Sequence, residues 1–247
     1  DWNGTSWTEV NDLNTARRGL GGNGIITAAL AVGGYNGAAN VAIVEQWNGT
    51  SWTEVGDLNS NRSGVQSAGS DTAALAFGGF EGTRLALTED WNGTSWTEVA
   101  DLAVARDTLA GAGTNTAALR IGGANDSGSE VALVESWNGS AWTEIADLNT
   151  ARDYLGGAGT QTSALAYGGN TGSVSGATES WDGSSWTEVN DMATARQQIG
   201  CGGANNTAAL ASVGETPSTS AATEEWAFSG LNPATTPAAD YSDAIVG

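Results

Sequence analysis

The chain has 247 residues, of which 28 are acidic and 8 are basic, so its net charge is −20. Every basic residue is an arginine, because the chain contains neither lysine nor histidine. Nucleic acids and anionic membranes bind clustered Lys and Arg, so this composition excludes both as partners. The 11 tryptophans and 36 glycines indicate a folded chain rich in tight turns, since Trp gains much from burial and Gly permits positive φ.

Cysteine chemistry is limited by Cys201, the only cysteine, which has no partner for a disulfide within the chain. A Cys–His nucleophile is excluded as well, because the chain has no histidine. We expect Cys201 to be a small buried apolar residue in a glycine-rich strand. No residue pattern predicts a cofactor.

A repeat of 44 to 46 residues runs through the chain, marked by first tryptophans at positions 2, 47, 91, 137, 181 and 226. This period suits a four-stranded propeller blade or a pair of helices. Asn-Gly between two Trp-bearing runs favours a hairpin, because a type I′ turn needs positive φ, and helices do not tolerate this much glycine. We therefore predict an all-β fold, a five-bladed β-propeller of four-stranded antiparallel blades.

The unit that follows Arg62 illustrates the predicted blade. Its four strands are expected at Ser63–Ala68, Ala73–Gly79, Leu85–Trp91 and Ser95–Val99. The first strand of each unit is made almost entirely of small residues, as in Leu109–Gly113. Small residues favour the innermost position, where neighbouring strands converge and leave little room for side chains. A lined channel is the alternative interpretation.

The ends of the chain indicate how the propeller is completed. We place the domain at residues 1–230, with blades starting near 17, 62, 106, 152 and 196. No second tryptophan follows Trp226, so we predict that residues 6–10 provide the outer strand of the last blade and close the ring. Residues 231–247 are expected to form a linker or tail toward a further domain. Because Asp1 falls within a repeat, we expect the sequence to be part of a longer protein.

A family resemblance is carried by Arg62, Gly78-Gly79, the Glu89-x-Trp91 segment and Trp96, which resemble a kelch repeat. The fifth unit departs from it with Val213-Gly214 in place of Gly-Gly. The phrases Trp-Asn-Gly-Thr-Ser-Trp-Thr-Glu-Val and Leu-Asn-Thr-Ala-Arg are also similar to kelch-type repeat proteins of aquatic bacteriophages. That resemblance implies a virion or tail-associated protein, an extracellular or virion location, host attachment like that of a tail fibre, and a possible homo-oligomer in a fibre.

The charged residues that recur in every unit are interpreted as structural. Five arginines each follow an aspartate by five residues, at Arg17, Arg62, Arg106, Arg152 and Arg196. We predict that they bridge strands or blades by bidentate pairing to carboxylates. A set of anion sites is the alternative.

The second tryptophan of each hairpin is likewise predicted to be structural and to pack between neighbouring blades. These residues are Trp7, Trp52, Trp96, Trp142 and Trp186. Platforms that stack sugar rings are the alternative interpretation. The Asn-Gly-Thr sequences at positions 3, 48 and 92 match glycosylation sequons, but the hairpin explains them without sugar.

Catalysis is not predicted, although paired carboxylates also occur in glycosidases. The acidic residues recur at equivalent positions in every unit, whereas a catalytic pair would break that symmetry. The kelch-type copper oxidases use histidine ligands, which this chain lacks. The stretch Asn125–Glu130 contains oxygen ligands suitable for Ca²⁺, but the same residue types form ordinary turns, and no metal site is predicted.

The functional prediction rests on the residues that differ from one repeat to the next. The loops between the second and third strands differ in every unit, whereas those between the first and second strands are alike. The residue after each repeated arginine also varies and is expected near the same face. Binding residues commonly lie on loops held by a rigid scaffold, so we predict a non-catalytic module that binds a glycan, a protein receptor or neighbouring virion proteins. A purely architectural spacer or assembly unit is the first alternative, and a glycosidase that uses paired carboxylates is the lesser one. The predicted ligand-binding residues are Tyr35, Asn36, Phe80, Glu81, Arg84, Asn125, Asp126, Asn170 and Thr171.

Overall fold

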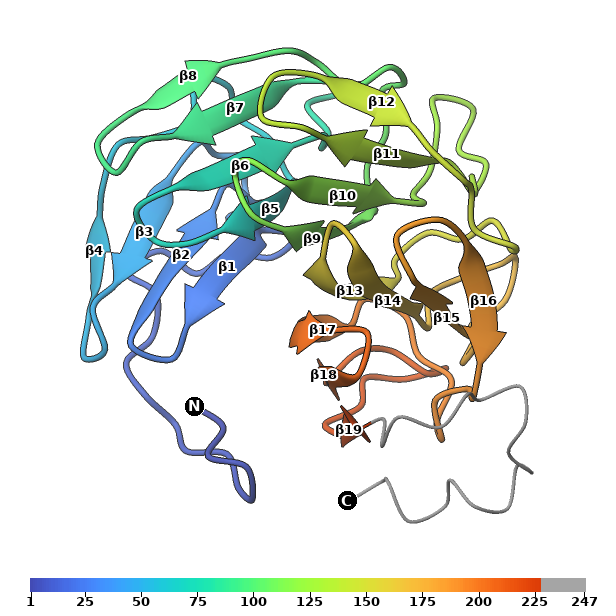
Figure 1. Cartoon of the computed structure of the whole chain (residues 1–247). Helices are drawn as coiled ribbons and strands as arrows, with labels where there is room; N and C mark the ends of the chain where they lie inside the picture. Colours follow the sequence, from blue (N-terminus) through green and yellow to red (C-terminus); the bar gives the residue numbers. More distant parts are fainter. Residues whose placement is uncertain (228–247) are drawn as a thin grey trace. The chain divides into compact units, whose positions relative to one another are not determined.

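The computed structural model describes residues 1–227, which contain 19 β-strands and no helix. The strands form five antiparallel sheets in sequence order, and the predicted all-β, five-bladed β-propeller is confirmed (Figure 1). The described part of the chain therefore has no helix that could cross a membrane. The predicted tail at residues 231–247 lies outside the described residues.

The chain divides into two compact units. The first contains residues 1–107 with two short pieces, 114–116 and 139–141, and it includes blades one and two. The second contains residues 108–113, 117–138 and those from 142 onward, and it includes blades three to five. Each unit has its own clusters of buried apolar residues.

The first unit consists of two four-stranded blades. Blade one is β1 (Gly21–Ile25), β2 (Ala28–Val32), β3 (Val44–Trp47) and β4 (Trp52–Glu54). Blade two is β5 (Gln66–Gly69), β6 (Ala74–Phe77), β7 (Thr88–Trp91) and β8 (Trp96–Glu98). Within each blade, successive strands pair antiparallel and the first strand lies at one edge.

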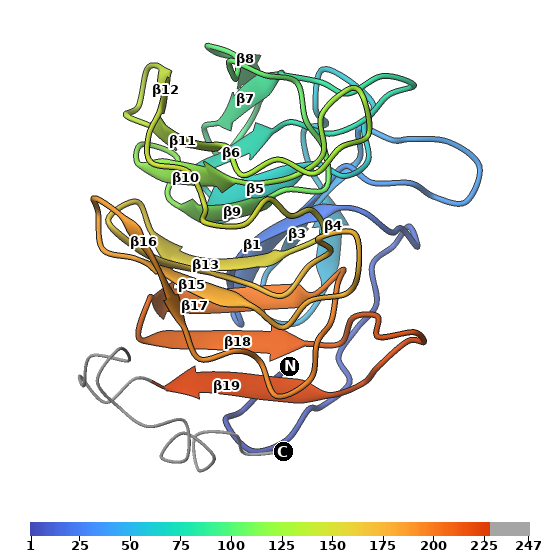
Figure 2. The same ribbon diagram turned by 90° about the vertical axis from the view of Figure 1, so that its right-hand side faces the viewer.

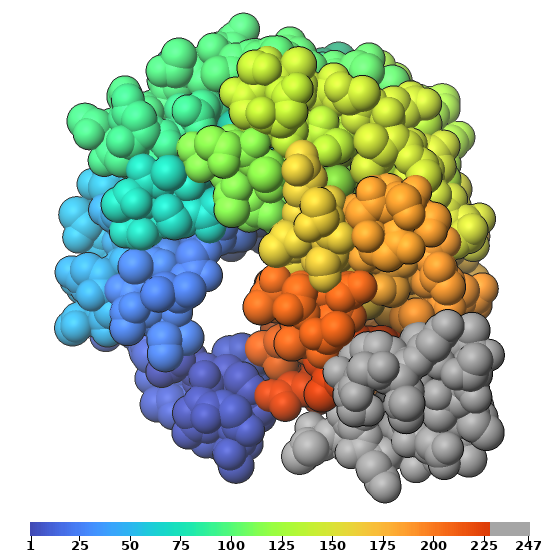
Figure 3. Space-filling view, in the orientation of Figure 1, coloured from blue at the N-terminus to red at the C-terminus, as the bar shows by residue number. Residues whose placement is uncertain are grey.

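The second unit consists of two four-stranded blades and one of three strands. Blade three is β9 (Ala110–Gly113), β10 (Ala118–Ile121), β11 (Val134–Trp137) and β12 (Trp142–Glu144). Blade four is β13 (Gly156–Thr160), β14 (Ser163–Tyr167), β15 (Thr178–Trp181) and β16 (Trp186–Val189). Blade five is β17 (Gly200–Asn205), β18 (Ala208–Ser212) and β19 (Thr223–Ala227), seen as successive arrows in Figure 2. The atoms of blades four and five pack side by side in Figure 3, in yellow and orange.

The strands are shorter than predicted, because the ends of the expected runs form single bridges instead of ladders. In blade two, Ser63 pairs only with Phe80 and lies outside β5. Strand β6 ends before Gly78 and Gly79, which have φ of 66° and 109°. Left-handed backbone cannot continue an extended strand, so these glycines turn the chain into the loop that follows.

Blade five differs from the expected four-stranded form, because its sheet contains only β17, β18 and β19. The predicted outer strand, residues 6–10, is not part of this sheet. Trp7 instead forms a bridge with Trp2 in a local hairpin, and their rings lie 5.4 Å apart. Trp2 occupies the same repeat position as Trp226. Closure of the last blade by residues 6–10 stays a prediction.

Glycine in the first strands is explained by close packing between neighbouring blades. In the second unit, a Cβ added at Gly157 of β13 would lie 2.8 Å from the Cβ of Ala110 on β9. In the first unit, a Cβ added at Gly21 of β1 would lie 3.1 Å from the backbone nitrogen of Ser67 on β5. These distances leave almost no space for larger side chains, which supports the steric interpretation of the small residues.

Cys201 on β17 is an exception to this tight packing. It was expected to be buried, but it is an exposed free cysteine. Gly202, beside it, has no atom within 4 Å of the position where a Cβ would be added. Blade five is the last blade of its unit, so no further first strand of that unit covers this face of β17.

The repeated arginines link neighbouring blades and are almost fully buried. Nη2 of Arg62 binds Oε1 of Glu89 at 2.8 Å, and Nη1 donates to the carbonyl of Leu87. The carbonyl of Arg62 accepts from the backbone N–H of Gly34 in the preceding blade at 2.8 Å. The pairing therefore uses one glutamate oxygen and backbone carbonyls, and is not the bidentate pairing that we predicted. The same ion pair joins Arg17 to Glu45, Arg152 to Glu179 and Arg196 to Glu224.

A further buried arginine, Arg120, stands on β10 at the repeat position where blade four has Ala166. Arg106 and Arg120 are both 0% exposed. Nη1 of Arg120 binds Oε1 of Glu135 at 3.2 Å. The carbonyl of Arg106 accepts from the backbone N–H of Gly79 at 3.1 Å, the same link that Arg62 makes with its preceding blade.

The tryptophan pairs form part of the core. The first tryptophan of a hairpin is buried, as with Trp91 at 1% exposure, and its indole N–H donates to the carbonyl of Asp71 in the turn between the first two strands. Trp96 and Trp186 are also buried and belong to apolar clusters that join neighbouring blades. Trp52 and Trp142 are half-buried, and Trp7 is 50% exposed.

Candidate functional site

The variable loops of the first unit are joined to the residues that follow the repeated arginines. Arg18 and Tyr35 exchange two backbone hydrogen bonds, at 3.0 and 2.8 Å, and the Arg18 guanidinium lies 5.0 Å from the centre of the Tyr35 ring. Ser63 and Phe80 make the equivalent backbone pair in blade two. A common backbone frame therefore presents different side chains in the two blades.

The two loops of this unit also contact each other. The Asn40 amide donates to the carbonyl of Phe80 at 2.9 Å. Nε of Arg84 binds Oδ1 of Asp107 at 2.7 Å, with 21% of the Arg84 side chain and 13% of the Asp107 side chain exposed. The predicted residues Tyr35, Phe80 and Arg84 are thus half-buried and held in place, whereas Asn36 and Glu81 are exposed. The Asn36 side-chain oxygen accepts from the N–H groups of residues 38 and 39 and shapes its own turn.

The loops of the second unit have the same frame and a more acidic surface. Asp153 pairs with Asn170 in blade four, and Gln197 pairs with Glu215 in blade five. The Asn170 amide donates to Oε1 of Glu130 from the neighbouring loop at 3.3 Å. Asp126 and Thr171 are exposed at the tips of their loops, and Asn125 and Asn170 are half-buried.

The loop at Asn125 is organised as a turn. Oδ1 of Asn125 accepts from the backbone N–H groups of Ser127 and Ser129 and from the Ser127 hydroxyl. Hydrogen bonds of this kind are typical of Asx turns. Residues 1–227 contain no group of three or more Cys, Asp or Glu side chains placed to hold a metal ion.

Three residues that the sequence analysis missed lie in this loop region. Thr108, Tyr154 and Gln198 each stand two residues after a repeated arginine and have φ of 53°, 52° and 54°. Their backbones form a chain of hydrogen bonds from blade to blade, in which Tyr154 donates to Thr108 at 2.7 Å and Gln198 donates to Tyr154 at 2.9 Å. Gly19 and Gly64 occupy this position in the first unit. Aligning the repeats would have revealed glycine replaced by larger residues in blades three to five.

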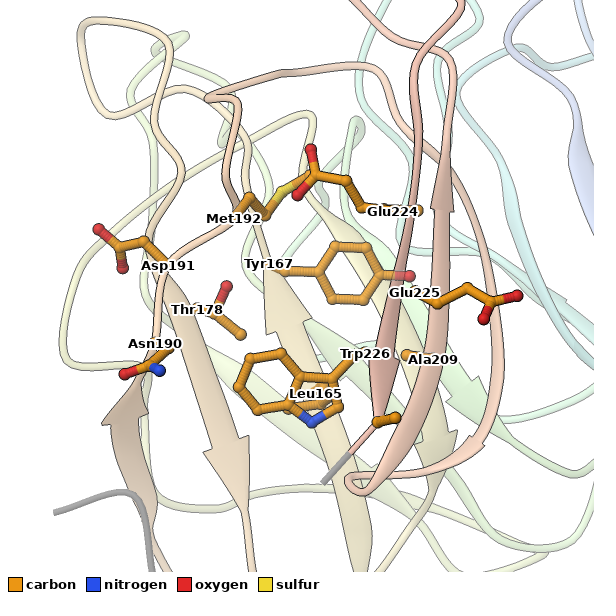
Figure 4. A pocket seen from close by; sticks show the side chains of 12 residues that line it. Leu165, Tyr167, Thr178, Asn190, Asp191, Met192, Ala209, Glu224, Glu225 and Trp226 are labelled. Atoms are coloured by element: carbon orange, nitrogen blue, oxygen red, sulfur yellow. The ribbon is translucent and has the colours of Figure 1, made fainter. Parts of the chain in front are cut away.

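A hollow lies between blades four and five of the second unit, and Figure 4 shows the side chains around it. Leu165 and Tyr167 of β14 form its floor, and Trp226 of β19 closes one side. The segment after β16, residues 190–192, lines the opposite side. The wall is mainly apolar, and the Tyr167 hydroxyl donates to the carbonyl of Leu210 at 3.0 Å. The sequence analysis did not predict this hollow.

Tyr167 makes stability depend on alkaline pH. Burial raises the pKa of its hydroxyl well above its ordinary value of 10.0. Since the folded state binds this proton more tightly than the unfolded state, the stabilisation is complete below pH ~10 and is lost as the pH rises toward the folded-state pKa. We expect the free energy of unfolding to fall above pH ~10 by up to ~1.4 kcal/mol per pH unit from this residue. In Tyr167→Phe, the free energy of unfolding measured by urea denaturation should fall less steeply between pH 9 and pH 11. An unchanged slope would contradict the assignment.

No protein-family model matches the sequence, and no curated protein matches it either. The five-bladed β-propeller therefore rests on the strands and sheets themselves.

Proposed function

We propose that this protein is a non-catalytic recognition module that binds a glycan or a protein partner through the loop side chains described above. The support lies in a constant backbone frame with variable side chains. Residue pairs such as Arg18–Tyr35, Asp153–Asn170 and Gln197–Glu215 have the same bridge and entirely different chemistry. A frame of this kind holds binding residues in fixed positions while permitting them to differ.

Tyr154 gives the strongest support for this proposal. The residue is 38% exposed although its backbone is left-handed, with φ of 52°. That conformation disfavours a residue with a Cβ by roughly 1–2 kcal/mol, and such strain is concentrated at functional sites. Glycine at the same position in blades one and two shows that the frame does not require tyrosine. Thr108 and Gln198 share this backbone conformation, and Tyr154 is the one of the three whose aromatic side chain suits contact with a partner.

The first unit also presents aromatic and charged side chains that suit binding. Tyr35 and Phe80 present partly exposed aromatic rings, and Arg84 adds a positive charge held by Asp107. Aromatic and arginine side chains are the residues that most often dominate binding energies at protein interfaces, and flat aromatic faces also suit sugar rings.

We further propose a kelch-type relationship and a role in host attachment by a virion or tail fibre. The support for this narrower version is the resemblance of the repeats to kelch-type proteins of aquatic bacteriophages. The strongly acidic composition favours neither nucleic acid nor anionic membrane as the partner.

The direct test is a glycan array combined with a pull-down of proteins from candidate host surfaces. Variants Tyr35→Ala, Phe80→Ala and Arg84→Ala should each weaken binding or host attachment at least about tenfold, as expected for central contact residues. Glu98→Ala, an exposed change on β8 away from the loops, serves as the control. Absence of any ligand, together with unchanged attachment by the three variants, would instead favour an architectural spacer.

Replacing Tyr154 by glycine separates binding from folding. We expect Tyr154→Gly to raise the free energy of unfolding by about 1 kcal/mol, because the left-handed backbone no longer opposes a Cβ, and to reduce ligand binding. Urea denaturation and the same binding assay measure the two effects. Tyr154→Ala, which keeps the Cβ, should lose binding without the gain in stability. A variant that is less stable, or that binds unchanged, would count against this role.

A further inference from the structure

The basic side chains that reach solvent are gathered in the variable loops of the first unit. All eight basic residues of the chain are arginines, and all lie within residues 1–227. Six of these side chains are fully buried, namely those of Arg17, Arg62, Arg106, Arg120, Arg152 and Arg196. The other two are Arg18, which is exposed, and Arg84, whose side chain is 21% exposed. Both belong to the backbone frame of the loops in blades one and two.

A continuous set of contacts links these two arginines. The Arg18 guanidinium lies over the Tyr35 ring, 5.0 Å from its centre. Tyr35 forms a bridge with Asn40, whose amide donates to the carbonyl of Phe80 at 2.9 Å, and Phe80 forms a bridge with Arg84. The two cations and the two aromatic rings therefore make up one surface of the first unit, which we call the arginine–aromatic surface.

Both guanidinium groups retain donors for a ligand. Nε of Arg84 binds Oδ1 of Asp107 at 2.7 Å, and the two terminal nitrogens of Arg84 make no hydrogen bond with any of residues 1–227. Arg18 has no ion pair with the same residues, and its contact with Tyr35 uses the face of the guanidinium. The N–H groups at the edge of that plane stay available. Their fork matches a carboxylate, which it can bind at two points.

The second unit has no comparable surface, because acids stand at the same positions of its frame. Asp153 occupies the repeat position of Arg18, and Glu130 occupies that of Arg84. Glu215 occupies the repeat position of Tyr35. An anionic ligand is repelled by these carboxylates, so the first unit is the part of the chain suited to bind one.

A sugar acid fits the arginine–aromatic surface better than an acidic protein segment does. The chain has a net charge of −20, and Glu81 is exposed at the tip of the blade-two loop. A segment with several adjacent carboxylates would be repelled by both. A sugar acid carries a single carboxylate on a ring of hydroxyl groups, which can donate to Glu81 and accept from the exposed Asn36 amide. The half-buried Phe80 ring offers a flat face to such a sugar ring.

We propose that the arginine–aromatic surface binds an acidic saccharide through the carboxylate of a sugar ring. Arg18, held against Tyr35, donates two N–H groups to that carboxylate, and Phe80 packs against a neighbouring sugar face. This assignment rests on the proposed function, because it names the class of glycan that the loops bind. Its specific consequence is that removing the carboxylate charge from the saccharide weakens binding.

The test compares acidic saccharides with matched neutral ones, using the full chain and isothermal titration calorimetry. The acidic probes are a trisaccharide of galacturonic acid and sialyllactose, and their neutral counterparts are the methyl ester of the trisaccharide and lactose. We expect at least one acid to bind at least about tenfold more tightly than its counterpart, since hydrogen bonds between charged groups are the stronger ones. If neither acid is preferred, or if no probe binds, the inference is wrong. A neutral glycan or a protein found by array or pull-down, with binding that depends on Tyr35 and Phe80, would leave the proposed function standing in that case.

Two variants with the same change in net charge locate the bound carboxylate. Arg18→Gln removes an exposed guanidinium and should abolish the preference for the acid. Thr53→Glu also makes the net charge more negative by one, at an exposed position of β4 that faces Gln46, and should keep the preference. A preference that survives Arg18→Gln, or that disappears equally in Thr53→Glu, would reject the site.

A peptide of three glutamates distinguishes a saccharide from an acidic protein segment. It carries more carboxylates than sialyllactose and has no sugar ring. We expect it to bind at least about tenfold more weakly than the preferred acidic saccharide, because Glu81 and the acidic chain repel its additional charges. If the peptide binds as tightly as the saccharide and this binding is lost in Arg18→Gln, the ligand is an acidic protein segment and the proposal is overturned.

Discussion

Arg152→Ala is expected to lower the free energy of unfolding by about 3–5 kcal/mol, the range found when one partner of a buried ion pair is removed. Arg152 is 0% exposed, and its partner Glu179 is 2% exposed. Truncation leaves the glutamate charge buried without its cation, and it also removes the donor to the carbonyl of Ala177. Urea denaturation followed by circular dichroism measures the loss.

The matched control for this prediction is Arg18→Ala, which removes the same side chain from an exposed position. A change of no more than about 1 kcal/mol is expected there, from the exposed contact of Arg18 with the Tyr35 ring. The double variant Arg152→Met/Glu179→Leu should recover only part of the stability. Replacing both charges removes the desolvation penalty, but it also removes the acceptor of the Asn149 backbone N–H and amide, which donate to Oε2 of Glu179 at 2.7 and 2.8 Å. Similar losses for Arg152→Ala and Arg18→Ala would show that the buried pair has no special structural role.

Trp181→Ala is expected to have an effect of similar size, about 3–5 kcal/mol, because it creates a large cavity in a packed core. Trp181 is 3% exposed and lies in the cluster that joins blades three and four. Its indole N–H donates to the carbonyl of Gln161 at 2.9 Å, so truncation also removes the hydrogen bond that this carbonyl accepts. Thermal unfolding and urea denaturation both report the change.

Trp181→Phe distinguishes the two contributions. It retains an aromatic ring and loses the indole N–H, so it should recover more than half of the loss if packing dominates. If Trp181→Phe is as damaging as Trp181→Ala, the hydrogen bond to the turn is the more important contribution. A loss below about 1 kcal/mol for Trp181→Ala would contradict a core role.

The chain shows clearly why some features were predictable. A period near 45 residues, Asn-Gly hairpins and recurrent tryptophans are local and repeated five times, so each copy reinforces the inference from the others. The strand lengths were overestimated because Ser63 and its equivalents are extended without forming a ladder. Alternation of residue types cannot distinguish a single bridge from a strand, since both require extended backbone.

The candidate site was predictable only in part. The variation among the loops identified Tyr35, Phe80 and Arg84 as candidates. The repeat alone was enough to place them in the loops between the second and third strands. Tyr154 was missed because its distinguishing property is a positive φ, and the residue type does not indicate this conformation. The partner of each arginine was also undetermined, because the aspartates and glutamates of the repeat are all plausible partners by spacing.

By itself, the sequence determined the fold class, the number of blades and the positions that vary, because these follow from periodicity and residue type. Only the tertiary structure decided that Glu89 rather than Asp57 pairs with Arg62, that Cys201 is exposed, and that a hollow lies beside Trp226. Those properties depend on which side chains from distant parts of the chain meet across neighbouring blades. A contact of that kind is set by packing in three dimensions, and no single repeat contains it.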